Sequence, residues 1–459
     1  MTTTTLLEST ETIVDSRTQD TVKGSLAGWG RVPVVPGSEI RSEDLRHLSL
    51  EPRLARGLGR AYGDAALPAA GDRHVIGTAL ADRVLAFDEQ TGVLQAEAGL
   101  SLDTMCRLFL PRGYFTPVSP GTRYVTLGGM VACDVHGKNH HEAGSFGGHI
   151  RSLTVRVADG RVIRCSPSEQ ADLFRATIGG MGLTGTILEA EVGLVRVATP
   201  WIYEEREALP DIDAVIAGLK ESASRWPMTV AWLDCLARGR SMGRGVIIRG
   251  RWARREEAGW ALGRPPRQLP VPVEFPGFAL SSPSVRTFNT LYHGIHALRR
   301  RSGVVHPFTF FYPLDSLSHW RRLYGRRGFV QYQCVVPEPD VHGPTRKLLT
   351  LLAEQRRTSF LCVLKDCGPE GVGLLSFPRP GISVALDIPM REGTQELIDA
   401  LNAIVIAAGG RIYLAKDALT RAEHLREMEP RLDAFLAARR HWDPDGRFRS
   451  AQSVRLFGW

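Results

Sequence analysis

Three glycine-rich segments hold the residues of this chain whose types and spacing most clearly point to chemistry. They run over 56–64, 120–148 and 179–185. A glycine in regular structure costs about 1 kcal/mol of chain entropy relative to alanine, so this density of glycines needs a cause. Glycines allow backbone N–H groups to approach a pyrophosphate closely. A tight turn explains any one segment equally well, but the three together favour a dinucleotide cradle.

The first of these segments lacks the spacing of the Rossmann fingerprint. Its glycines stand as Gly57-x-Gly59-x-x-x-Gly63, one residue longer than G-x-G-x-x-G. Arg56, which precedes them, does not end an apolar strand. The sequence therefore disfavours a Rossmann fold although it predicts a bound dinucleotide.

Polar side chains on predicted strands are the candidates for the rest of a site. Gln331 and Gln333 share one face of a strand predicted over 329–336, as the two-residue period requires. Lys365 ends an otherwise apolar strand predicted over 360–365. These polar groups indicate either a wet surface or the lining of a cavity.

A cluster of cysteine and histidine residues raises the alternative of a metal site. Cys133, His136, His140 and His141 are close in sequence, and zinc binds such ligands at short spacing. However, the chain has no second ligand pair and no HExxH motif. We therefore expect no metal, and interpret the glycines around the cluster as part of the dinucleotide cradle.

Composition narrows the possible partners. The net charge is +8, and arginine is concentrated in 238–267, 299–301 and 321–327. Such clusters suit an anionic membrane or a phosphorylated substrate, and since no nucleic-acid motif accompanies them we expect no nucleic-acid partner. The chain has no apolar stretch of roughly 20 residues and no visible signal peptide, and its seven cysteines form no CxxC pair. These features predict a cytoplasmic protein.

Short strands and helices must position these groups. Alternating apolar residues predict a hairpin that turns at 91–92, and another turns at 159–160. Ser101 stands where a helix N-cap belongs. Hairpins outnumber long helices, which predicts an α+β fold rather than βαβ units. Further strands are predicted over 186–192, 229–236, 246–249 and 382–388, helices over 171–177, 211–222, 346–355 and 394–408, and a lid, linker or loop over the Pro-rich 265–283.

Three strings carry a resemblance to a known family. They are 55–64 (ARGLGRAYGD), 120–129 (PGTRYVTLGG) and 133–141 (CDVHGKNHH). They resemble the FAD-binding loops of the vanillyl-alcohol-oxidase-like superfamily and, within it, of the decaprenylphosphoryl-β-D-ribose 2-oxidase family. Matches at 376–381 (SFPRPG) and 415–417 (AKD) extend the resemblance over nearly the whole chain.

The resemblance implies an α+β fold with two parts. One is a two-lobed FAD-binding domain of the vanillyl-alcohol-oxidase type, and the other is a separate substrate domain built on an antiparallel sheet. We expect a flexible N-terminus over 1–25, the FAD-binding domain over 26–196, the substrate domain over 197–410, and a C-terminal segment, 411–459, that returns to the FAD-binding domain.

The resemblance also assigns cofactor contacts. Members that hold FAD covalently through the first loop use a histidine there, whereas this chain has Ala61 and Tyr62, so we predict non-covalent FAD. The expected cofactor contacts are Arg56, Gly57, Leu58, Gly59, Arg60, Ala61, Tyr62, Gly63, Asp64, Gly121, Thr126, Leu127, Gly128, Gly129, Cys133, Asp134, Val135, His136, Ile187 and Tyr413.

Flavin-dependent oxidation of an alcohol needs a group that takes the hydroxyl proton and donors near the flavin ring. By resemblance, Lys416, Lys365 and His136 are the expected catalytic residues. Gln331, Gln333, Ala385 and Trp232 are the expected substrate contacts. Actinobacterial members carry a cysteine at the position of Ala385, which covalent nitro-aromatic inhibitors attack. We therefore expect this chain to keep oxidase activity and to escape that capture.

The function implied is oxidation of the ribose 2-hydroxyl of a polyprenylphosphoryl-β-D-ribose to the 2-keto sugar, the first half of epimerisation to the arabinose form. An NADH-dependent keto-reductase is the expected partner, and the basic surface is expected to make a peripheral membrane contact. Two alternatives stay open from sequence: a sugar-lactone or other carbohydrate oxidase on the same scaffold, and a basic binding protein without turnover.

Overall fold

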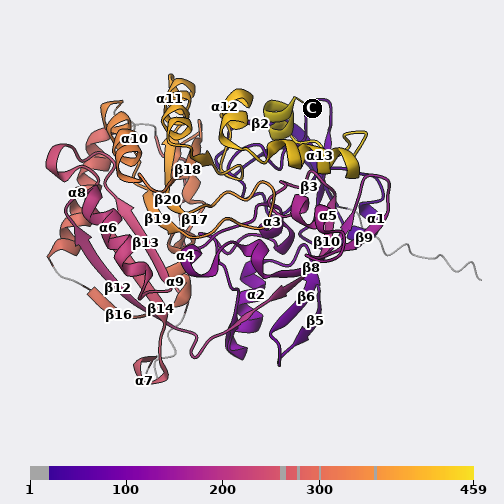
Figure 1. The fold of residues 1–459 in the computed structure, drawn as a ribbon, viewed down its shortest axis with the longest axis horizontal. Helices are drawn as coiled ribbons and strands as arrows, with labels where there is room; N and C mark the ends of the chain where they lie inside the picture. Colours follow the sequence, from indigo (N-terminus) through magenta and orange to yellow (C-terminus); the bar gives the residue numbers. More distant parts are fainter. Residues whose placement is uncertain (1–19, 259–264, 277–279, 299–300, 356–358, 459) are drawn as a thin grey trace, which may run out of the picture.

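The computed structural model describes residues 20–258, 265–276, 280–298, 301–355 and 359–458 (Figure 1). Its mixture of hairpins and helices confirms the predicted α+β class. In Figure 1 the largest sheet occupies the left half of the view, and strands β5, β6, β8 and β10 lie at the lower right, below the yellow C-terminal helices.

The first two hundred residues form two of the sheets. One has the strand order β1-β2-β4-β3, in which β2 and β3 run parallel to β4. The other, β5-β6-β10-β8-β9, is antiparallel throughout. The strands are β1 (Asp20–Ala27), β2 (Val34–Arg41), β3 (Ala55–Arg56), β4 (His74–Gly77), β5 (Val84–Asp88), β6 (Val93–Glu97), β8 (Ile150–Arg156), β9 (Val162–Cys165) and β10 (Thr186–Gly193).

Later residues supply an antiparallel sheet of eight strands, with the order β16-β12-β14-β13-β19-β20-β18-β21. It carries the predicted strand of Lys365 near its centre and the predicted strand of Gln331 next to its β21 edge. The strands are β12 (Ile202–Leu209), β13 (Met228–Leu233), β14 (Gly245–Trp252), β16 (Arg301–Val305), β18 (Phe329–Pro337), β19 (Cys362–Cys367), β20 (Gly381–Pro389) and β21 (Arg411–Ile412). Two short pairs join β7 (Tyr114–Phe115) to β11 (Val195–Arg196) and β15 (Leu269–Pro270) to β17 (Leu317–Ser318).

Helices cover the sheets. On the eight-stranded sheet, α6 contacts β13 and β14, and α11 contacts β18. The helices are α1 (Leu45–Leu48), α2 (Leu102–Phe109), α3 (Leu127–Ala132), α4 (His140–Ala143), α5 (Ala171–Thr177), α6 (Ile212–Ala223), α7 (Arg255–Ala258), α8 (Ser282–Ala297), α9 (Pro307–Phe311), α10 (His342–Glu354), α11 (Thr394–Ala407), α12 (Ala422–Met428), α13 (Leu432–Trp442) and α14 (Ala451–Phe457).

The two faces of β18 have different surroundings. Tyr332 points into the large apolar core under α11, where its hydroxyl donates to the Asn402 amide oxygen at 3.0 Å. Gln331 and Gln333 point to the other face, as the two-residue period predicts. One face of the sheet therefore packs against helices, and the other is left to form a cavity wall.

Local signals placed several elements correctly. The Ser101 hydroxyl accepts from the Thr104 N–H at 3.0 Å and begins α2, and Gly113 adopts a φ of +80° just after the helix and the single 3₁₀ turn that follows it. The strand predicted over 229–236 is shorter, because Asp234 leaves the sheet to form an ion pair with Arg244.

The N-terminal prediction needs a correction. Most of the segment expected to be flexible, 1–19, lies outside the described residues. Its remainder, 20–25, belongs to β1, which pairs with β2 along its whole length. The Pro-rich stretch 265–283 was predicted to be a lid, linker or loop. It contains β15, which pairs with β17, and the first residues of α8, which begins at Ser282.

Candidate functional site

A cavity of about 310 Å³ lies between the glycine loops and the open face of the eight-stranded sheet. Segments far apart in sequence form its wall, including 57–62, parts of 119–136, four strands of the large sheet and 413–416. Of the residues predicted to contact cofactor or substrate, or to take part in catalysis, the cavity brings together Gly57, Leu58, Gly59, Arg60, Ala61, Tyr62, Gly121, Thr126, Gly128, Gly129, Cys133, Val135, His136, Ile187, Gln331, Gln333, Lys365, Ala385, Tyr413 and Lys416.

Three glycines of the loops each leave room or conformational freedom that a side chain would remove. Gly59 has a φ of +64°, a conformation that favours glycine. A Cβ atom on Gly57 would lie 2.3 Å from the Thr126 hydroxyl oxygen. A Cβ atom on Gly121 would meet no protein atom within 4 Å, although this residue lines the cavity. Glycine at 121 therefore leaves space for a ligand rather than for protein.

Backbone donors in the first loop are available to such a ligand. In the described part of the chain, the N–H groups of Leu58, Gly59, Arg60 and Ala61 have no hydrogen-bond partner. The Arg60 guanidinium lies 4.0 Å from the ring centroid of Trp29, which holds a cation beside these donors. Four free amides and an arginine fit the pyrophosphate of a dinucleotide such as FAD.

Lys416 brings its amine to the cavity wall. Its Nζ lies 3.8 Å from the ring centroid of Tyr62, and Tyr62 is held by a hydrogen bond from its N–H to the Ala415 carbonyl. Burial lowers the pKa of Lys416 to about 7, with Asp387 opposing the shift and Lys365 adding to it. A lysine in this state exchanges a proton near neutral pH.

Two more lysines line the same cavity. Burial lowers the pKa of Lys365 to about 8. Burial, followed by repulsion from Lys365, lowers the pKa of Lys138 to about 7. Sequence reasoning missed Lys138, because a lysine is exposed by default. Its position within the 133–141 string was the signal that could have indicated a buried role.

His136 lines the cavity and is hydrogen-bonded to Gln333. The Gln333 amide Nε2 donates to His136 Nε2 at 2.9 Å and to the Ser383 hydroxyl at 3.1 Å. His136 Nδ1 is buried and has no hydrogen-bond partner among the described residues. Burial holds the pKa of His136 well below its usual value, so the ring is neutral, and if Nε2 accepts from Gln333 the ring proton is on Nδ1.

A buried carboxyl behind the cavity was also missed. Asp387 accepts hydrogen bonds from the Tyr324 hydroxyl at 2.7 Å and from the Gln331 amide at 2.5 Å. Burial raises its pKa to about 6. Gln331 therefore cannot rotate freely, because Asp387 fixes its amide. The aspartate lies on β20 two residues from Ala385, on the same strand face, which is the signal that could have found it.

Tyr413 closes the far wall. Its hydroxyl donates to the Cys133 carbonyl at 2.9 Å, and its ring lies 5.4 Å from that of His136. Cys133 itself lines the cavity, but burial raises the pKa of its thiol to about 12. The thiol is therefore protonated and unreactive at neutral pH.

Some predicted contacts lie away from the cavity lining. Arg56 pairs with Glu39 at 3.4 Å, behind the first loop. Trp232 lies beyond the cavity, where its indole N–H donates to the Phe360 carbonyl and its ring packs against Tyr292. The other predicted residues that do not line the cavity are Gly63, Asp64, Leu127 and Asp134.

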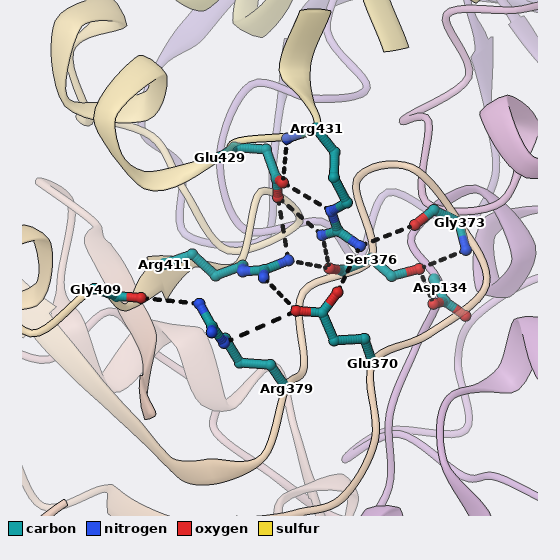
Figure 2. A network of polar contacts seen from close by, with 9 residues as sticks. All are labelled: Asp134, Glu370, Gly373, Ser376, Arg379, Gly409, Arg411, Glu429 and Arg431. Atoms are coloured by element: carbon teal, nitrogen blue, oxygen red, sulfur yellow. Dashed lines mark hydrogen bonds and ion pairs between the residues drawn. The ribbon is translucent and has the colours of Figure 1, made fainter. Parts of the chain in front are cut away.

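Asp134 anchors the second loop from behind. It accepts from the Gly147 N–H at 2.7 Å and from the Ser376 hydroxyl, and burial raises its pKa to about 6. Figure 2 shows that Ser376 is in turn held by Arg431, whose guanidinium donates to the Ser376 carbonyl at 2.7 Å. Arg411 joins the same network through Glu370. These residues support the loop without reaching the cavity.

The histidines of the proposed metal alternative are engaged in other contacts. His140 pairs with the Ser145 hydroxyl at 3.2 Å and accepts from the Gly368 N–H at 3.0 Å. His141 Nε2 lies 2.9 Å from the Trp226 carbonyl. Among the described residues, three or more metal-ligating side chains do not converge anywhere.

Comparisons with known proteins agree with this geometry. Residues 51–166 match the FAD binding domain family, and residues 382–456 match the D-arabinono-1,4-lactone oxidase family. The decaprenylphosphoryl-beta-D-ribose oxidase of Mycolicibacterium smegmatis is 36% identical over 94% of this chain and 97% of its own length. An uncharacterized Streptomyces coelicolor protein is 36% identical over 78% of this chain and 100% of its own length. Bovine mitochondrial D-2-hydroxyglutarate dehydrogenase is 32% identical over 26% of this chain and 23% of its own length. The chain belongs to the decaprenylphosphoryl-β-D-ribose oxidase family of FAD-dependent oxidoreductases.

Proposed function

We propose that this enzyme oxidises the 2-hydroxyl of a polyprenylphosphoryl-β-D-ribose to the 2-keto sugar, the first half of epimerisation to the arabinose form. The observation that carries the proposal is the set of three half-buried lysines, Lys138, Lys365 and Lys416, that line one cavity with the dinucleotide cradle. Among the described residues none of the three amines forms an ion pair with a carboxylate; Lys138 donates to the Phe310 carbonyl, and Lys416 lies over the Tyr62 ring. Amines without carboxylate partners at a cavity wall suit an anionic substrate. The named substrate of the Mycolicibacterium smegmatis relative supports the same reading.

The residues that would hold FAD are the free amides of the first loop and the wall around Gly121 and His136. When bound, the flavin supplies the hydride acceptor. We assign 26–196 and 411–459 to a two-lobed FAD-binding domain and 197–410 to the substrate domain. Three contacts support the return of the C-terminal segment: Arg455 with Asp64, Trp442 with Asp172, and α13 with α5.

The chain's own groups have distinct roles in the proposed reaction. Neutral Lys416 accepts the proton of the sugar hydroxyl at its Nζ, because its pKa of about 7 matches this task. Gln331, fixed by Asp387, and Gln333, fixed by Ser383, orient the sugar hydroxyls. Lys365 and Lys138 neutralise the substrate phosphate. Burial of the site excludes water from the reacting carbon.

The proposal extends to partners. A keto sugar must be reduced to complete an epimerisation, so we infer an NADH-dependent keto-reductase that consumes the product. Because the substrate carries a lipid tail, we infer that the enzyme makes a peripheral contact with the membrane. We infer that it acts in the cytoplasm. Among the described residues, the helices are too short or too polar to cross a bilayer.

Anaerobic titration of the purified protein with polyprenylphosphoryl ribose, followed through the flavin absorbance, tests the reaction. We expect stoichiometric bleaching and a keto sugar that borohydride reduces to ribose and arabinose forms. Absence of bleaching by this substrate would refute the proposal. Absence of any flavin spectrum would instead favour the alternative of a basic binding protein without turnover.

A sugar-lactone oxidase is the second candidate, favoured by the match of residues 382–456 to the D-arabinono-1,4-lactone oxidase family. Titration with free sugars and sugar lactones under the same conditions separates the two candidates. Bleaching by a lactone at lower concentration than by polyprenylphosphoryl ribose would select the second.

The mode of cofactor attachment has its own test. Ala61 and Tyr62 occupy the loop where a tethering histidine would stand, so we propose non-covalent FAD. Acid precipitation should release the yellow colour into the supernatant. Colour that stays with the pellet would contradict this.

A further inference from the structure

Helix α8 presents an uncovered apolar stripe. Phe288, Leu291, Ile295 and Leu298 recur at intervals of three and four residues and are 47%, 61%, 48% and 88% exposed. This spacing places them on one side of the helix, with Leu298 as the residue that caps its end. Four large apolar side chains exposed side by side are unusual on a soluble surface and mark an interaction site.

The opposite side of α8 fixes the helix in place. Val285 is buried in the apolar core, and the Asn289 amide donates to the Asp234 carboxylate at 2.8 Å. Tyr292 packs edge-on against Trp232, with ring centroids 4.6 Å apart. Because this side is well packed, the stripe is a fixed outer surface and not a core face that has become exposed.

The positive charge of the sequence around α8 favours an anionic partner. Residues 275–314 contain no aspartate or glutamate, and their four arginines are Arg286, Arg299, Arg300 and Arg301. Three of these follow the stripe directly. Arg286 and Arg301, which lie in the described part of the chain, are exposed, and anionic lipid headgroups would neutralise them, whereas a second copy would bring the same cations against one another.

We propose that α8 docks this enzyme on an anionic lipid bilayer, with the stripe inserted among the acyl chains and Arg286 and Arg301 at the headgroups. This proposal rests on the proposed function, because docking would place the enzyme at the bilayer that holds the polyprenyl tail of the substrate. Phe288 packs edge-on against Phe360, 6.3 Å between centroids, and the next residue, Leu361, lines the cavity. The helix that meets the membrane therefore lies against the cavity wall.

Flotation of the holoenzyme with vesicles tests the docking. The vesicles contain phosphatidylcholine alone or an equal mixture with phosphatidylglycerol, at low and high salt. The test variant is Leu291→Glu/Ile295→Glu. The matched control is Leu108→Glu, because Leu108 is 43% exposed on helix α2. We expect the wild type and the control to float with the mixed vesicles, and the double variant to bind at least tenfold more weakly.

Two further measurements make the outcomes decisive. Flavin reduction by a water-soluble, short-chain ribosyl phosphate should be unchanged in the double variant, which shows that it is folded and separates docking from the reaction. Equal flotation of wild type and double variant, or no flotation of the wild type, would overturn the docking proposal. A wild-type dimer in light scattering that the double variant loses would assign the stripe to a subunit interface and overturn it as well.

Discussion

At the scale of single residues, the unusual feature is a set of half-buried amines that form no ion pair with a carboxylate among the described residues. Desolvation disfavours the charged form of such a group, and neighbouring lysines reinforce the effect. Lys416 is such an amine. It also lies over the ring of Tyr62, and its pKa is about 7. It is protonated below neutral pH and neutral above it, so its activity as a proton acceptor depends on pH.

We expect the rate of flavin reduction to rise with pH through about 7, because only the neutral amine of Lys416 accepts a proton. Lys416→Met should lower the rate by roughly 10²-fold or more and remove the rise. Stopped-flow reduction under anaerobic conditions at several pH values measures both. As control, Lys365→Met should keep the rise but move it to higher pH, since the charge of Lys365 lowers the pKa of Lys416.

A change of Asp387 tests whether Lys416 controls the pH dependence of the rate. Its attraction raises the pKa of Lys416 against the effect of burial. Asp387→Asn should therefore shift the rise in rate to lower pH. A shift to higher pH, or none, would show that another group controls the profile. Asp366→Asn is the matched control, because Asp366 pairs with Lys220 at 2.7 Å instead.

Ala385 determines whether the cavity can be labelled covalently by a nitro-aromatic inhibitor. It lines the cavity opposite Gln333 on the neighbouring strand. Ala385→Cys places a thiol there, so we expect a covalent adduct after turnover in the presence of a nitro-aromatic inhibitor, detected by intact mass. The wild type should gain no mass, because the pKa of the remaining cavity thiol, Cys133, is about 12. An adduct on the wild type would contradict this.

Sequence reasoning reached the residues that a local pattern or a family string identifies. Period two placed Gln331 and Gln333 on one face, and the strings placed Gly57, Gly121 and Lys416 at the cavity. It missed Lys138 and Asp387, whose burial depends on distant elements. It assigned Trp232 to the substrate, whereas that ring packs under α8.

At the scale of elements, the C-terminal helix α14 fastens the first glycine loop. Arg455 donates to both oxygens of Asp64, at 3.0 and 2.8 Å, and to Asp417 at 2.8 Å. Both carboxylates are almost fully buried. One arginine therefore connects the loop that cradles the cofactor to the segment that carries Lys416.

Arg455→Gln should lower the free energy of unfolding by about 3–5 kcal/mol, because it leaves two buried carboxylates without their cation. FAD should also be released more easily. Arg449→Gln is the control, since Arg449 and Asp72 are each more than a third exposed and such a pair contributes about 0–1 kcal/mol. Thermal unfolding and FAD fluorescence measure the two effects, and equal destabilisation of both variants would contradict the prediction.

Elements with strong local signals were predicted well, and those that depend on long-range pairing were not. The periodicity of α6 and the cap of α2 gave their positions nearly to the residue. Strand β1 lacks a clear apolar alternation, so only its pairing with β2 reveals it. The two residues of β21 gain their strand character from the edge of β18.

At the scale of the whole molecule, the cavity separates two apolar cores. One core packs under the eight-stranded sheet, and the other packs around the five-stranded sheet. The wall of the cavity draws on both sheets, for example Ile187 from β10 and Val363 from β19. A ligand that fills it therefore contacts both sheets.

Removal of FAD should lower the thermal stability of the entire chain. A ligand bound only to the native state at about 100 times its dissociation constant adds about 2.7 kcal/mol to the free energy of unfolding. Differential scanning calorimetry of apoprotein with added FAD should show a single transition moving to higher temperature. FAD that leaves the transition unchanged would contradict a site between the two cores.

The contact between Arg455 and Asp64 spans 391 positions of the chain. During synthesis the first glycine loop leaves the ribosome long before the arginine that holds it. The first glycine loop therefore gains this ion pair only after synthesis has reached α14, and a shorter nascent chain leaves the carboxylate of Asp64 without its cation.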